Sequence, residues 1–511
     1  MKKSQLEEAL TQIYETILDK QDTAEKIAAA VHPDFRMSAR NLYRYLILRN
    51  FDLRKIHDTL SDLGLSSLRS AEGYVLSNVT NVLRLIKLLR GEEFKPVADV
   101  EMVNYKQSQK LLRLHTNSLF KEKRKKHSTD IMVTLPTEAA TDIDLIRNLA
   151  KEGMEIARIN LSHDGMEVWE NMVTNIKAVR KELGVNLKIY MDLSGPKIRT
   201  SEIQIGGVDK KKKSVQNFIT LAKGDQLVLT KKETKGRQVT MRDNDKVRNF
   251  AEIGLMLPQI IDDLKVDDTV YFDDGMIKAR VVSKTEEQAS LEITKAYKSK
   301  LSTHKGINLP DTRLHLDSLT ERDIELLPYI CRHADMVGYS FVRTASDVRR
   351  LYEELAKNGK SNIGVVFKIE NREAFQNLPL ILFEAMKRPK IGVMIARGDL
   401  AVEIGYERIS EVQSEIMWLC EAAHIPVIWA TQVLDNLAKT GIATRAEVSD
   451  AAISAQAECV MLNKGKHILD AVRTLRVITR KMEAHASKKK SRLRPLKVAK
   501  RSLKKVNKQM D

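Results

Sequence analysis

The sequence predicts an α/β fold, a (β/α)8 TIM barrel with a β-rich lid domain inserted after its third strand, preceded by an all-helical N-terminal domain. Three observations predict it: helical periodicity over roughly the first 120 residues, eight short apolar runs that alternate with amphipathic stretches, and one long interruption between the third and fourth runs. Because a doubly wound open sheet shows the same alternation, periodicity alone leaves that architecture open. The chain of 511 residues also exceeds what one compact core usually holds.

The N-terminal part, residues 1–125, has the pattern of a helical domain. Its apolar residues recur at spacings of three and four, at Leu6, Leu10, Ile13 and Ile17, then at Leu42, Leu46, Leu53, Ile56 and Leu60, and again over residues 75–89. The basic stretch 121–127 follows, and β-like runs begin only after it. We interpret this stretch as a linker.

The barrel is predicted in two parts, residues 126–199 and 308–486. Its eight candidate strands are 131–135, 155–161, 187–193, 335–341, 364–369, 391–396, 426–430 and 459–462. The lid, residues 200–307, contains alternating segments joined by Gly and Asp-Gly turns, among them 226–230, 269–272 and 291–294. The last part, residues 487–511, is predicted to be a basic tail.

The net charge of +18 suggests nucleic acid until its position is considered. Residues 487–511 hold eleven Lys or Arg, one Asp and no aromatic residue, so much of the charge lies in the tail. We interpret the tail as a solvated, frayed segment. A weak electrostatic tether to RNA, membrane or an acidic protein remains the alternative.

Cysteine usage and hydropathy indicate the compartment. Cys331, Cys420 and Cys459 lie far apart and form no Cys-x-x-Cys pair, which favours small core residues over a disulfide framework or a zinc site. No uncharged apolar run is long enough to span a membrane, and the charged start is unlike a signal peptide. We therefore expect a soluble, cytoplasmic protein.

Polar residues follow the apolar strands repeatedly, at the ends where a parallel barrel gathers its reactive groups. They are Arg158, Asn160, Ser162 and His163 after the second strand, Asp192, Ser194, Lys197 and Arg199 after the third, Ser340 after the fourth, Lys368 and Glu370 at the fifth, Asp399 at the sixth, and Thr431 and Gln432 at the seventh.

Lys368, Glu370 and Asp399 carry the strongest chemical signal. Strand alternation places Lys368 and Glu370 on one face, where the plainer interpretation is a simple ion pair at a strand end. Asp399 ends the next strand, and two carboxylates form the half-shell of oxygen ligands that Mg²⁺ or Mn²⁺ prefers. With Arg158 and Lys368 as cations, the set predicts transfer of a phosphoryl group.

Eight ordered segments resemble the pyruvate kinase family over roughly residues 131–485. The segments are 157–163 (ARINLSH), 191–200 (MDLSGPKIRT), 273–275 (DDG), 305–310 (KGINLP), 367–371 (FKIEN), 396–400 (ARGDL), 430–432 (ATQ) and 444–450 (TRAEVSD). The family fold, a barrel with a lid inserted after the third strand, agrees with the periodicity. The resemblance implies phosphoryl transfer from phosphoenolpyruvate to ADP, giving pyruvate and ATP in glycolysis through a metal-stabilised enolate.

The resemblance also implies roles for individual residues. In these roles Arg158 and Lys368 hold the phosphoryl group, Glu370 and Asp399 bind Mg²⁺ or Mn²⁺, Ser340, Gly398 and Thr431 contact the substrate, and Arg199 and Lys305 contact the nucleotide phosphates. The Lys368 ammonium would stabilise the enolate, and Thr431 would order a proton relay.

Some positions depart from the family pattern. Many members bind a monovalent cation through positions that match Asn160, Ser162, Asp192 and the carbonyl of residue 193, with Thr and Glu where this chain has Leu193 and Lys197. A fixed ammonium at Lys197 would replace K⁺, so we expect activity without K⁺; the alternative is that Lys197 faces solvent.

Two loops and the two ends of the chain leave further points open. The segment 461–466 differs from the family's usual pattern, so the nucleotide preference stays open. The first strand lacks the family's usual Gly-Pro pair, so no residue role is carried over from that strand. The family's C-terminal regulatory domain is not evident. The N-terminal domain could be a regulatory or oligomerisation module or a passive cap; we expect a homo-oligomer.

Two other functions remain open at this stage. One is another metal-dependent enolate-forming barrel enzyme, against which Arg199 and Lys305 argue because a nucleotide needs those cations. The other is a catalytically inactive binding protein whose tail finds nucleic acid. A decayed site should have lost some of the residues that this chain keeps, namely Arg158, Asp192, Lys368, Glu370, Asp399 and Thr431.

Overall fold

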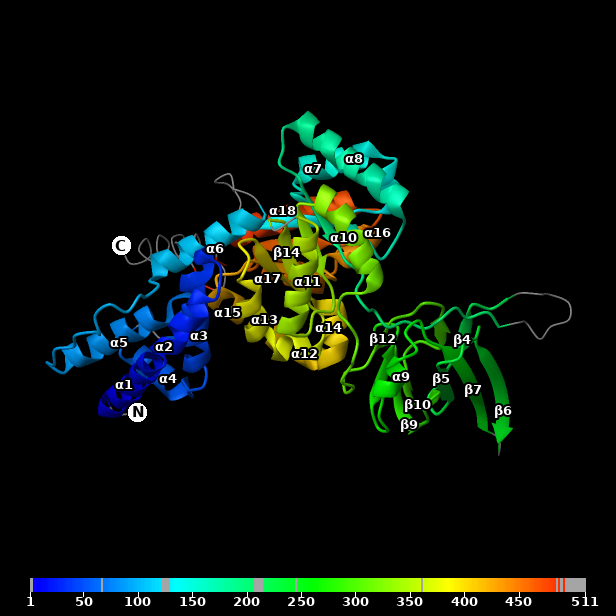
Figure 1. Cartoon of the computed structure of the whole chain (residues 1–511), viewed down its shortest axis with the longest axis horizontal. Coiled ribbons are helices and arrows are strands. Elements are labelled where there is room, and N and C mark those ends of the chain that lie inside the picture. Colours follow the sequence, from blue (N-terminus) through cyan, green and yellow to red (C-terminus); the bar gives the residue numbers. More distant parts are fainter. Residues whose placement is uncertain are drawn as a thin grey trace, which may run out of the picture.

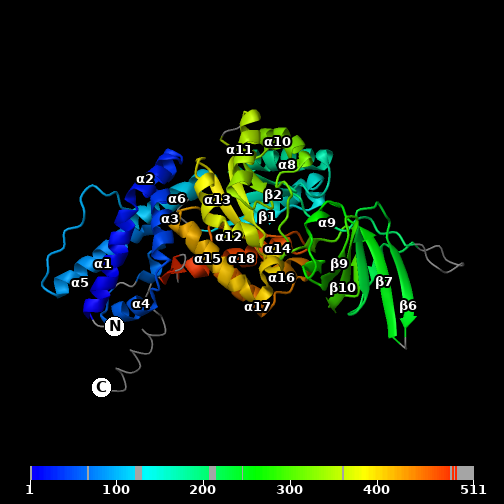
Figure 2. The ribbon, with the colours of Figure 1, turned by 60° about the horizontal axis from the view of Figure 1, so that its bottom comes forward.

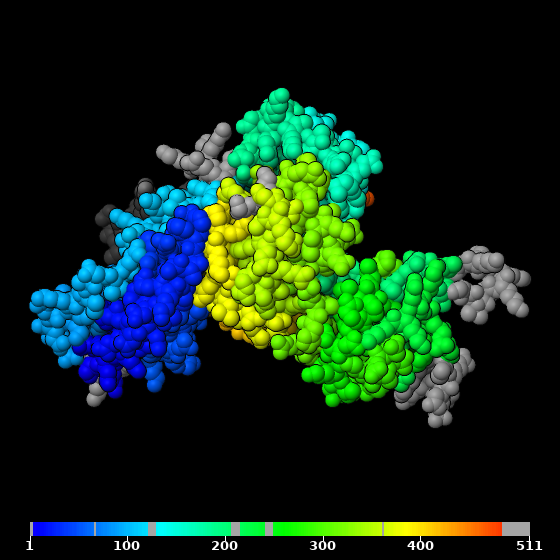
Figure 3. All heavy atoms as spheres, in the orientation of Figure 1, coloured from blue at the N-terminus to red at the C-terminus, as the bar shows by residue number. Residues whose placement is uncertain are grey.

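The computed structural model describes residues 3–65, 68–120, 129–205, 215–243, 246–359, 362–483, 486–487 and 490–491. A helical domain, a central barrel and a β-rich lid follow one another along the longest axis (Figure 1). The space-filling view shows the helical domain against one side of the barrel and the lid at the opposite end (Figure 3). The predicted linker and most of the predicted basic tail lie outside the described residues.

The N-terminal domain is helical, as its periodicity predicted, and six α-helices lie in its described residues. They are α1 (Lys3–Asp19), α2 (Gln21–Ala29), α3 (Arg36–Leu48), α4 (Arg54–Asp62), α5 (Val75–Leu89) and α6 (Tyr105–Leu119). Leu6, Leu10, Leu42 and Leu60 are fully buried between them. The amphipathic spacing thus gives a helical core, in which each helix turns its apolar face inward.

The last of these helices, α6, connects the N-terminal domain to the base of the barrel. It begins at a capping box formed by Asn104 and Gln107. At its other end, Leu119 and Phe120 join a buried cluster made of inward-facing barrel residues such as Met336 and Met394. The N-terminal domain therefore closes the end of the barrel opposite to the strand ends that carry the polar residues.

A buried polar network also joins the two domains. His424, at the end of a barrel helix, is fully buried, and its Nδ1 lies 3.0 Å from Ser38 Oγ, while its Nε2 lies 2.8 Å from the carbonyl of Gly73 and 3.2 Å from Ser108 Oγ. The ring of His115 contacts the carbonyl of His424 at 2.7 Å. Burial lowers the pKa of His424 to about 3, so its ring is neutral in this network.

Eight parallel strands close into a barrel in the order β1-β17-β16-β15-β14-β13-β3-β2. They are β1 (Asp130–Thr134), β2 (Ile156–Asn160), β3 (Lys188–Asp192), β13 (Met336–Tyr339), β14 (Gly364–Ile369), β15 (Ile391–Ala396), β16 (Val427–Ala430) and β17 (Cys459–Leu462). Their ends differ from the predicted runs by at most two residues. The barrel is confirmed, and the open sheet is excluded because the first and last strands pair.

Helices cover the outside of the barrel (Figure 2). They are α7 (Ile143–Glu152), α8 (Met166–Leu183), α10 (Glu321–His333), α11 (Ala345–Lys357), α12 (Arg372–Gln376), α13 (Leu378–Ala385), α14 (Arg397–Ile404), α15 (Ile409–Ala422), α16 (Asp435–Thr440), α17 (Arg445–Ser454) and α18 (Ile468–Glu483). None of the described helices is long and apolar enough to cross a membrane. All three cysteines are buried, as expected for core residues.

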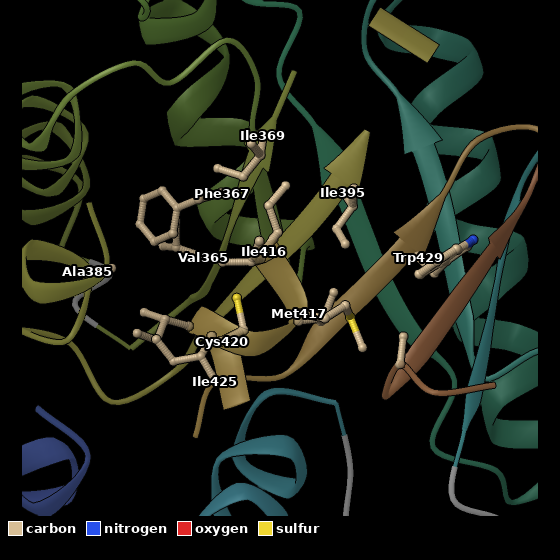
Figure 4. Packing of buried hydrophobic residues seen from close by; sticks show 14 of the residues in the cluster. Val365, Phe367, Ile369, Ala385, Ile395, Ile416, Met417, Cys420, Ile425 and Trp429 are labelled. Atoms are coloured by element: carbon tan, nitrogen blue, oxygen red, sulfur yellow. The ribbon is translucent and has the colours of Figure 1, made fainter. Parts of the chain in front are cut away.

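Strand β14 shows how alternation builds the site. Val365, Phe367 and Ile369 pack against the surrounding helices, in the same cluster as Cys420 of α15 (Figure 4). The residues between them, Val366 and Lys368, therefore point into the barrel. This geometry turns the Lys368 side chain toward the interior at the carboxyl end of the strand, as predicted.

The lid has its own core, a seven-stranded sheet in the order β12-β8-β9-β10-β5-β7-β6, and a separate pair formed by β4 and β11. Its strands are β4 (Phe218–Thr220), β5 (Gln226–Thr230), β6 (Arg237–Asp243), β7 (Lys246–Gly254), β8 (Thr269–Phe272), β9 (Ile277–Lys284), β10 (Gln288–Ala296), β11 (Lys300–Ser302) and β12 (Ile307–Asn308), with the short helix α9 (Ile260–Asp263). It follows β3 and returns through β12, as expected for an insertion after the third strand. The two connections meet at an antiparallel bridge between Arg199 and Gly306.

Candidate active site

The carboxyl ends of the barrel strands bring Lys368 among three polar partners. Its Nζ lies 3.0 Å from Glu370 Oε1 and 3.1 Å from Asp192 Oδ2, and it donates a hydrogen bond of 2.7 Å to Ser340 Oγ. Lys368 is 8% exposed. Burial by itself lowers the pKa of Lys368, but Asp192 and Glu370 outweigh burial and raise it. The ammonium therefore stays charged.

Asp192 holds a second cation in place. Arg158 donates to Asp192 Oδ2 through Nε at 3.1 Å and through Nη2, and its Nη1 donates to Thr134 Oγ1 at 2.9 Å. Tyr190 donates to the other oxygen of Asp192 at 3.0 Å. Burial opposes ionisation of Asp192, but Lys368 and Arg158 overcome it and lower the pKa of Asp192. One buried carboxylate thus orients two cations.

Glu370 and Asp399 fit a divalent cation. Glu370 Oε2 accepts a hydrogen bond of 2.8 Å from the backbone N–H of Phe341, which has a left-handed φ of 56°. Burial raises the pKa of Glu370, and although Lys368 lowers it, the nearby carboxylates of Asp399 and Asp192 raise it further. A bound divalent cation would relieve this repulsion. Among the described residues, no group of three or more His, Cys, Asp or Glu is arranged to hold a metal, so water and substrate would complete the coordination.

Lys197 does not simply face solvent. Its Nζ lies 3.0 Å and 3.1 Å from the two oxygens of Asp399, and the two side chains are 27% and 16% exposed. The connection from β3 to the lid therefore delivers an ammonium to one of the two predicted metal ligands. The sequence predicted Lys197 as the replacement for a monovalent cation and Asp399 as a metal ligand, and the structure brings these two side chains into contact.

The positions expected to hold a monovalent cation have protein partners. Asn160 Oδ1 accepts from the backbone N–H of Ser162 at 3.2 Å, and the carbonyl of Leu193 accepts from Ser340 Oγ at 2.6 Å. Asp192 accepts from Arg158 and Lys368. The oxygen atoms that would bind the ion thus have hydrogen-bond partners within the protein.

Thr431 is held in a strained turn beside Gly398. Its φ is 65°, and its Oγ1 accepts from the N–H of Gly398 at 2.9 Å. Arg397 donates to the carbonyl of Thr431 at 2.6 Å and pairs with Asp450 at 2.6 Å. A residue with β-branching rarely adopts this φ, so the hydrogen bonds from Gly398 and Arg397 stabilise the turn.

Most of the predicted residues line one cavity of about 190 Å³. They are Arg158, Asn160, Ser162, Leu193, Lys197, Arg199, Ser340, Lys368, Glu370, Asp399 and Thr431. Lys305 is outside this group: its Nζ lies 2.8 Å from Asp273 Oδ1, within the lid. Asp192 lies behind the cavity wall, and Gly398 stands beside Thr431.

A second cavity of about 270 Å³ continues from Arg158 and Asn160 toward the loop after β17. His163 and Lys464 line it. Burial lowers the pKa of His163, and the positive charges of Lys464 and Arg199 lower it further. The segment that departs from the family pattern thus contributes an ammonium to this cavity.

Four contributors were missed from the sequence: Thr134, Tyr190, the backbone N–H of Phe341 and Arg397. Thr134 ends β1, which like β17 supplied no candidate site residue, although its position at a strand end was a usable signal. Arg397 precedes the predicted Gly398 and Asp399, but its partners become visible only in the fold. Tyr190 lies two residues before Asp192 on β3, so strand alternation was a usable signal for it. The bond from the Phe341 N–H depends on a left-handed backbone conformation that no spacing predicts.

The arrangement has a defined chemical capacity. Two fixed cations and a carboxylate pair converge on a cavity of about 190 Å³. Such a site can bind a phosphorylated carboxylic acid and neutralise charge that develops on it.

Comparison with known proteins agrees with this geometry. The family model described as "Pyruvate kinase, barrel domain" matches residues 126–468. Pyruvate kinase 2 of Trypanosoma brucei brucei is 34% identical over 349 residues, covering 67% of this chain and 64% of that protein. Pyruvate kinase of Geobacillus stearothermophilus is 32% identical over 365 residues, covering 70% and 57%. A crystal structure of a pyruvate kinase from Cryptosporidium parvum has a TM-score of 0.60 at 25% identity and covers 70% of each chain. The chain thus spans less than two thirds of the length of these curated relatives.

Proposed function

Because the chain belongs to the pyruvate kinase family, we propose that it transfers the phosphoryl group of phosphoenolpyruvate to ADP, giving pyruvate and ATP in glycolysis. The observation that carries the proposal is the pair of cations, Arg158 and Lys368, fixed by one buried carboxylate beside Glu370 and Asp399.

In this reaction Arg158 and Lys368 bind the phosphoryl group. Their shared partner Asp192 keeps both side chains oriented, so little reorganisation is needed as charge moves. Loss of the phosphoryl group leaves an enolate, and the charged Lys368 stabilises its oxygen. Glu370 and Asp399 would hold a divalent cation, which would supply further neutralisation of the negative charge that develops.

The remaining substrate contacts come from the loops after β13, β15 and β16. We propose that the backbone near Gly398, with Thr431, receives the carboxylate of the substrate, and that Ser340 lies beside the phosphoryl group through its bond to Lys368. Thr431 Oγ1 is also the hydroxyl that would order the protonation of the enolate. The contacts of Arg397 support this role because they fix the turn.

We assign the nucleotide to the lid side of the site. Arg199 lines the smaller cavity and donates to the carbonyl of His304 at 3.1 Å, and Lys305 lies on the returning segment. Both would meet the nucleotide phosphates. The cavity of about 270 Å³ that His163 and Lys464 line adjoins the smaller cavity through Arg158, Asn160 and His163, and we assign the rest of the nucleotide to it.

The cofactors proposed are Mg²⁺ or Mn²⁺, without a requirement for K⁺. Lys197 supports the second point, because it brings a fixed positive charge into the cavity near the phosphoryl site. A strong activation by K⁺, measured in buffers otherwise free of K⁺ and Na⁺, would contradict it. From the family we further propose a homo-oligomer in the cytoplasm, with the domain boundaries given above.

A coupled assay for pyruvate, with phosphoenolpyruvate, ADP and Mg²⁺, tests the function. The wild type should turn over, and Lys368→Met should lose activity by about a thousandfold or more, because the charge that stabilises the enolate is gone. Lys357→Met, an exposed lysine paired with Glu354 on α11, is the matched control and should keep normal turnover. Circular dichroism shows whether each variant is folded. Near-normal turnover in Lys368→Met would refute the assignment.

A further inference from the structure

A third cavity lies between the lid connections and the barrel. Its volume is about 560 Å³, within the range typical of small-molecule sites. Residues 196–198 and 307–316, the two segments through which the lid joins the barrel, form one side, and the loop and helix after β14 form the other. Figure 1 shows α12 and α14 on the side of the barrel that faces β12. The cavity shares Lys197, Phe341, Glu370 and Asp399 with the proposed active site and otherwise extends away from it.

Among the cations that line this cavity, Arg343 has side-chain N–H donors that lack acceptors in the described part of the protein. It lies just after β13 and is 9% exposed. Among the described residues, the ionic partner of its guanidinium is Glu373 at 4.0 Å, which exceeds hydrogen-bond distance, and the guanidinium donates no hydrogen bond to any of them. A guanidinium has five N–H donors, and leaving them unsatisfied in a buried position is costly. The cavity is the side from which an acceptor can reach it.

The other arginines of the cavity behave differently. Arg372 donates to the carbonyl of Glu403 at 3.1 Å and lies 3.7 Å from Asp311, so it ties the barrel to the lid connection. Arg313 is exposed. The Nε of Arg372 is buried without a hydrogen-bond partner among the described residues, but its two Nη atoms contact Glu403 and Asp311. Arg343 has neither kind of contact within hydrogen-bond distance, so it is the group that awaits a ligand.

The rest of the lining defines the shape of that ligand. Pro196, Ile198, Leu309 and Leu316 present apolar surface, which suits an apolar body. Asp311, Glu373, Asp399 and Glu403 also line the cavity, so a polyphosphate would meet repulsion. A single oxyanion head on an apolar body satisfies both features, with the head on Arg343.

We propose that this cavity is a second ligand site, which binds a small organic anion through Arg343. The head group is a carboxylate or a phosphate monoester, and the body lies against the lid connections. The site goes beyond the proposed phosphoryl transfer and does not depend on it, because Arg343 has no part in that reaction. A molecule bound here contacts both connections of the lid and the barrel at once.

Benzoate and phenyl phosphate are suitable probes, with neutral benzamide as the comparison, and isothermal titration calorimetry on the full chain measures their binding. At least one of the two anions should bind the wild type, and benzamide should bind more weakly. Arg343→Gln should weaken the anion about tenfold or more, the loss expected for a charge-assisted hydrogen bond. Arg349→Gln, a neighbouring arginine on α11 that pairs with Glu384 at 3.1 Å, is the matched control and should bind as the wild type does.

Two more variants keep the test decisive. Gln376→Trp adds an indole at an exposed residue of the lining and should weaken binding while Arg343 is intact, which covers the case that Arg343→Gln does not fold. Lys368→Met should bind the anion normally, because this variant impairs only the proposed active site. Absence of binding by both anions, equal affinity in Arg343→Gln and wild type, or loss of binding in Lys368→Met alone would overturn the proposal.

Discussion

Replacing Lys197 by Met should increase the affinity of the resting protein for Mn²⁺. The Lys197 ammonium lies 3.0 Å from Asp399, so it competes with a metal ion for that carboxylate. Coulomb's law gives about 1.4 kcal/mol for two unit charges at this distance in water and about 5.5 kcal/mol at an effective dielectric constant of about 20. Because the side chains are 27% and 16% exposed, we take the lower figure as the expected gain. It corresponds to about tenfold tighter binding.

Electron paramagnetic resonance of free Mn²⁺ measures this affinity without any need for turnover. Lys298→Met is the control: it removes the same charge from the lid, where Lys298 pairs with Asp273 at 2.8 Å, and it should leave the Mn²⁺ affinity unchanged. Adding Asp399→Asn to Lys197→Met should abolish the gain, because the carboxylate for which the ammonium competes is removed. Unchanged or weaker Mn²⁺ binding in Lys197→Met would refute the competition that the ion pair implies.

Three further predictions concern stability and the support of the site. Burial raises the pKa of Glu403 from 4.5 to about 7, so the folded state favours the protonated acid and loses stability as pH rises between these values, by about 3 kcal/mol in all. The melting temperature of Glu403→Gln minus that of the wild type should therefore be larger above about pH 7 than at pH 5. An identical pH profile of the melting temperature in the two proteins would contradict this. The pKa of His424 is lowered from 6.5 to about 3, so the stability that its neutral ring contributes is fully present above pH 6.5 and falls by about 1.4 kcal/mol per pH unit on acidification. Between about pH 7 and pH 5, the melting temperature of His424→Gln should therefore drop less than that of the wild type. An equal drop in both proteins would count against a buried neutral ring. A Cβ at Gly338 would collide with Tyr190 and Asp192, which orient the cations of the site. Although residue 338 does not contact the substrate, Gly338→Ala should lower kcat about tenfold or more. An unchanged kcat in the pyruvate assay would show that catalysis does not need the Tyr190–Asp192 contact.

Much of the fold and part of the site could be predicted because they depend on local pattern. Each barrel strand is a short apolar run followed by an amphipathic stretch, and a barrel of such units needs no further information to bring its strand ends together. Alternation alone predicted that Lys368 and Glu370 share a face, and the 3.0 Å between them confirms it. The same logic predicted that Asp399, at the next strand end, stands nearby.

Other contacts depend on where loops travel after the strands end. Lys197 and Asp399 are 202 positions apart, and their ion pair exists because the connection to the lid turns back over the barrel mouth. The hydrogen bonds of Arg397 to the Thr431 turn and the nearly unsatisfied donors of Arg343 arise in the same way. No periodicity encodes these directions.

The sequence by itself thus determined the order of the elements and the residues at the strand ends, because hydrophobic period and chain direction are local properties. Periodicity left a closed barrel and an open sheet as alternatives, and the pairing of β1 with β17 decides between them. The tertiary structure decided which of those side chains touch, how the N-terminal domain closes the barrel through His424 and Leu119, and where the lid leaves a cavity. Those outcomes depend on side-chain direction and on distances across the fold, which arise only when separate segments pack against one another.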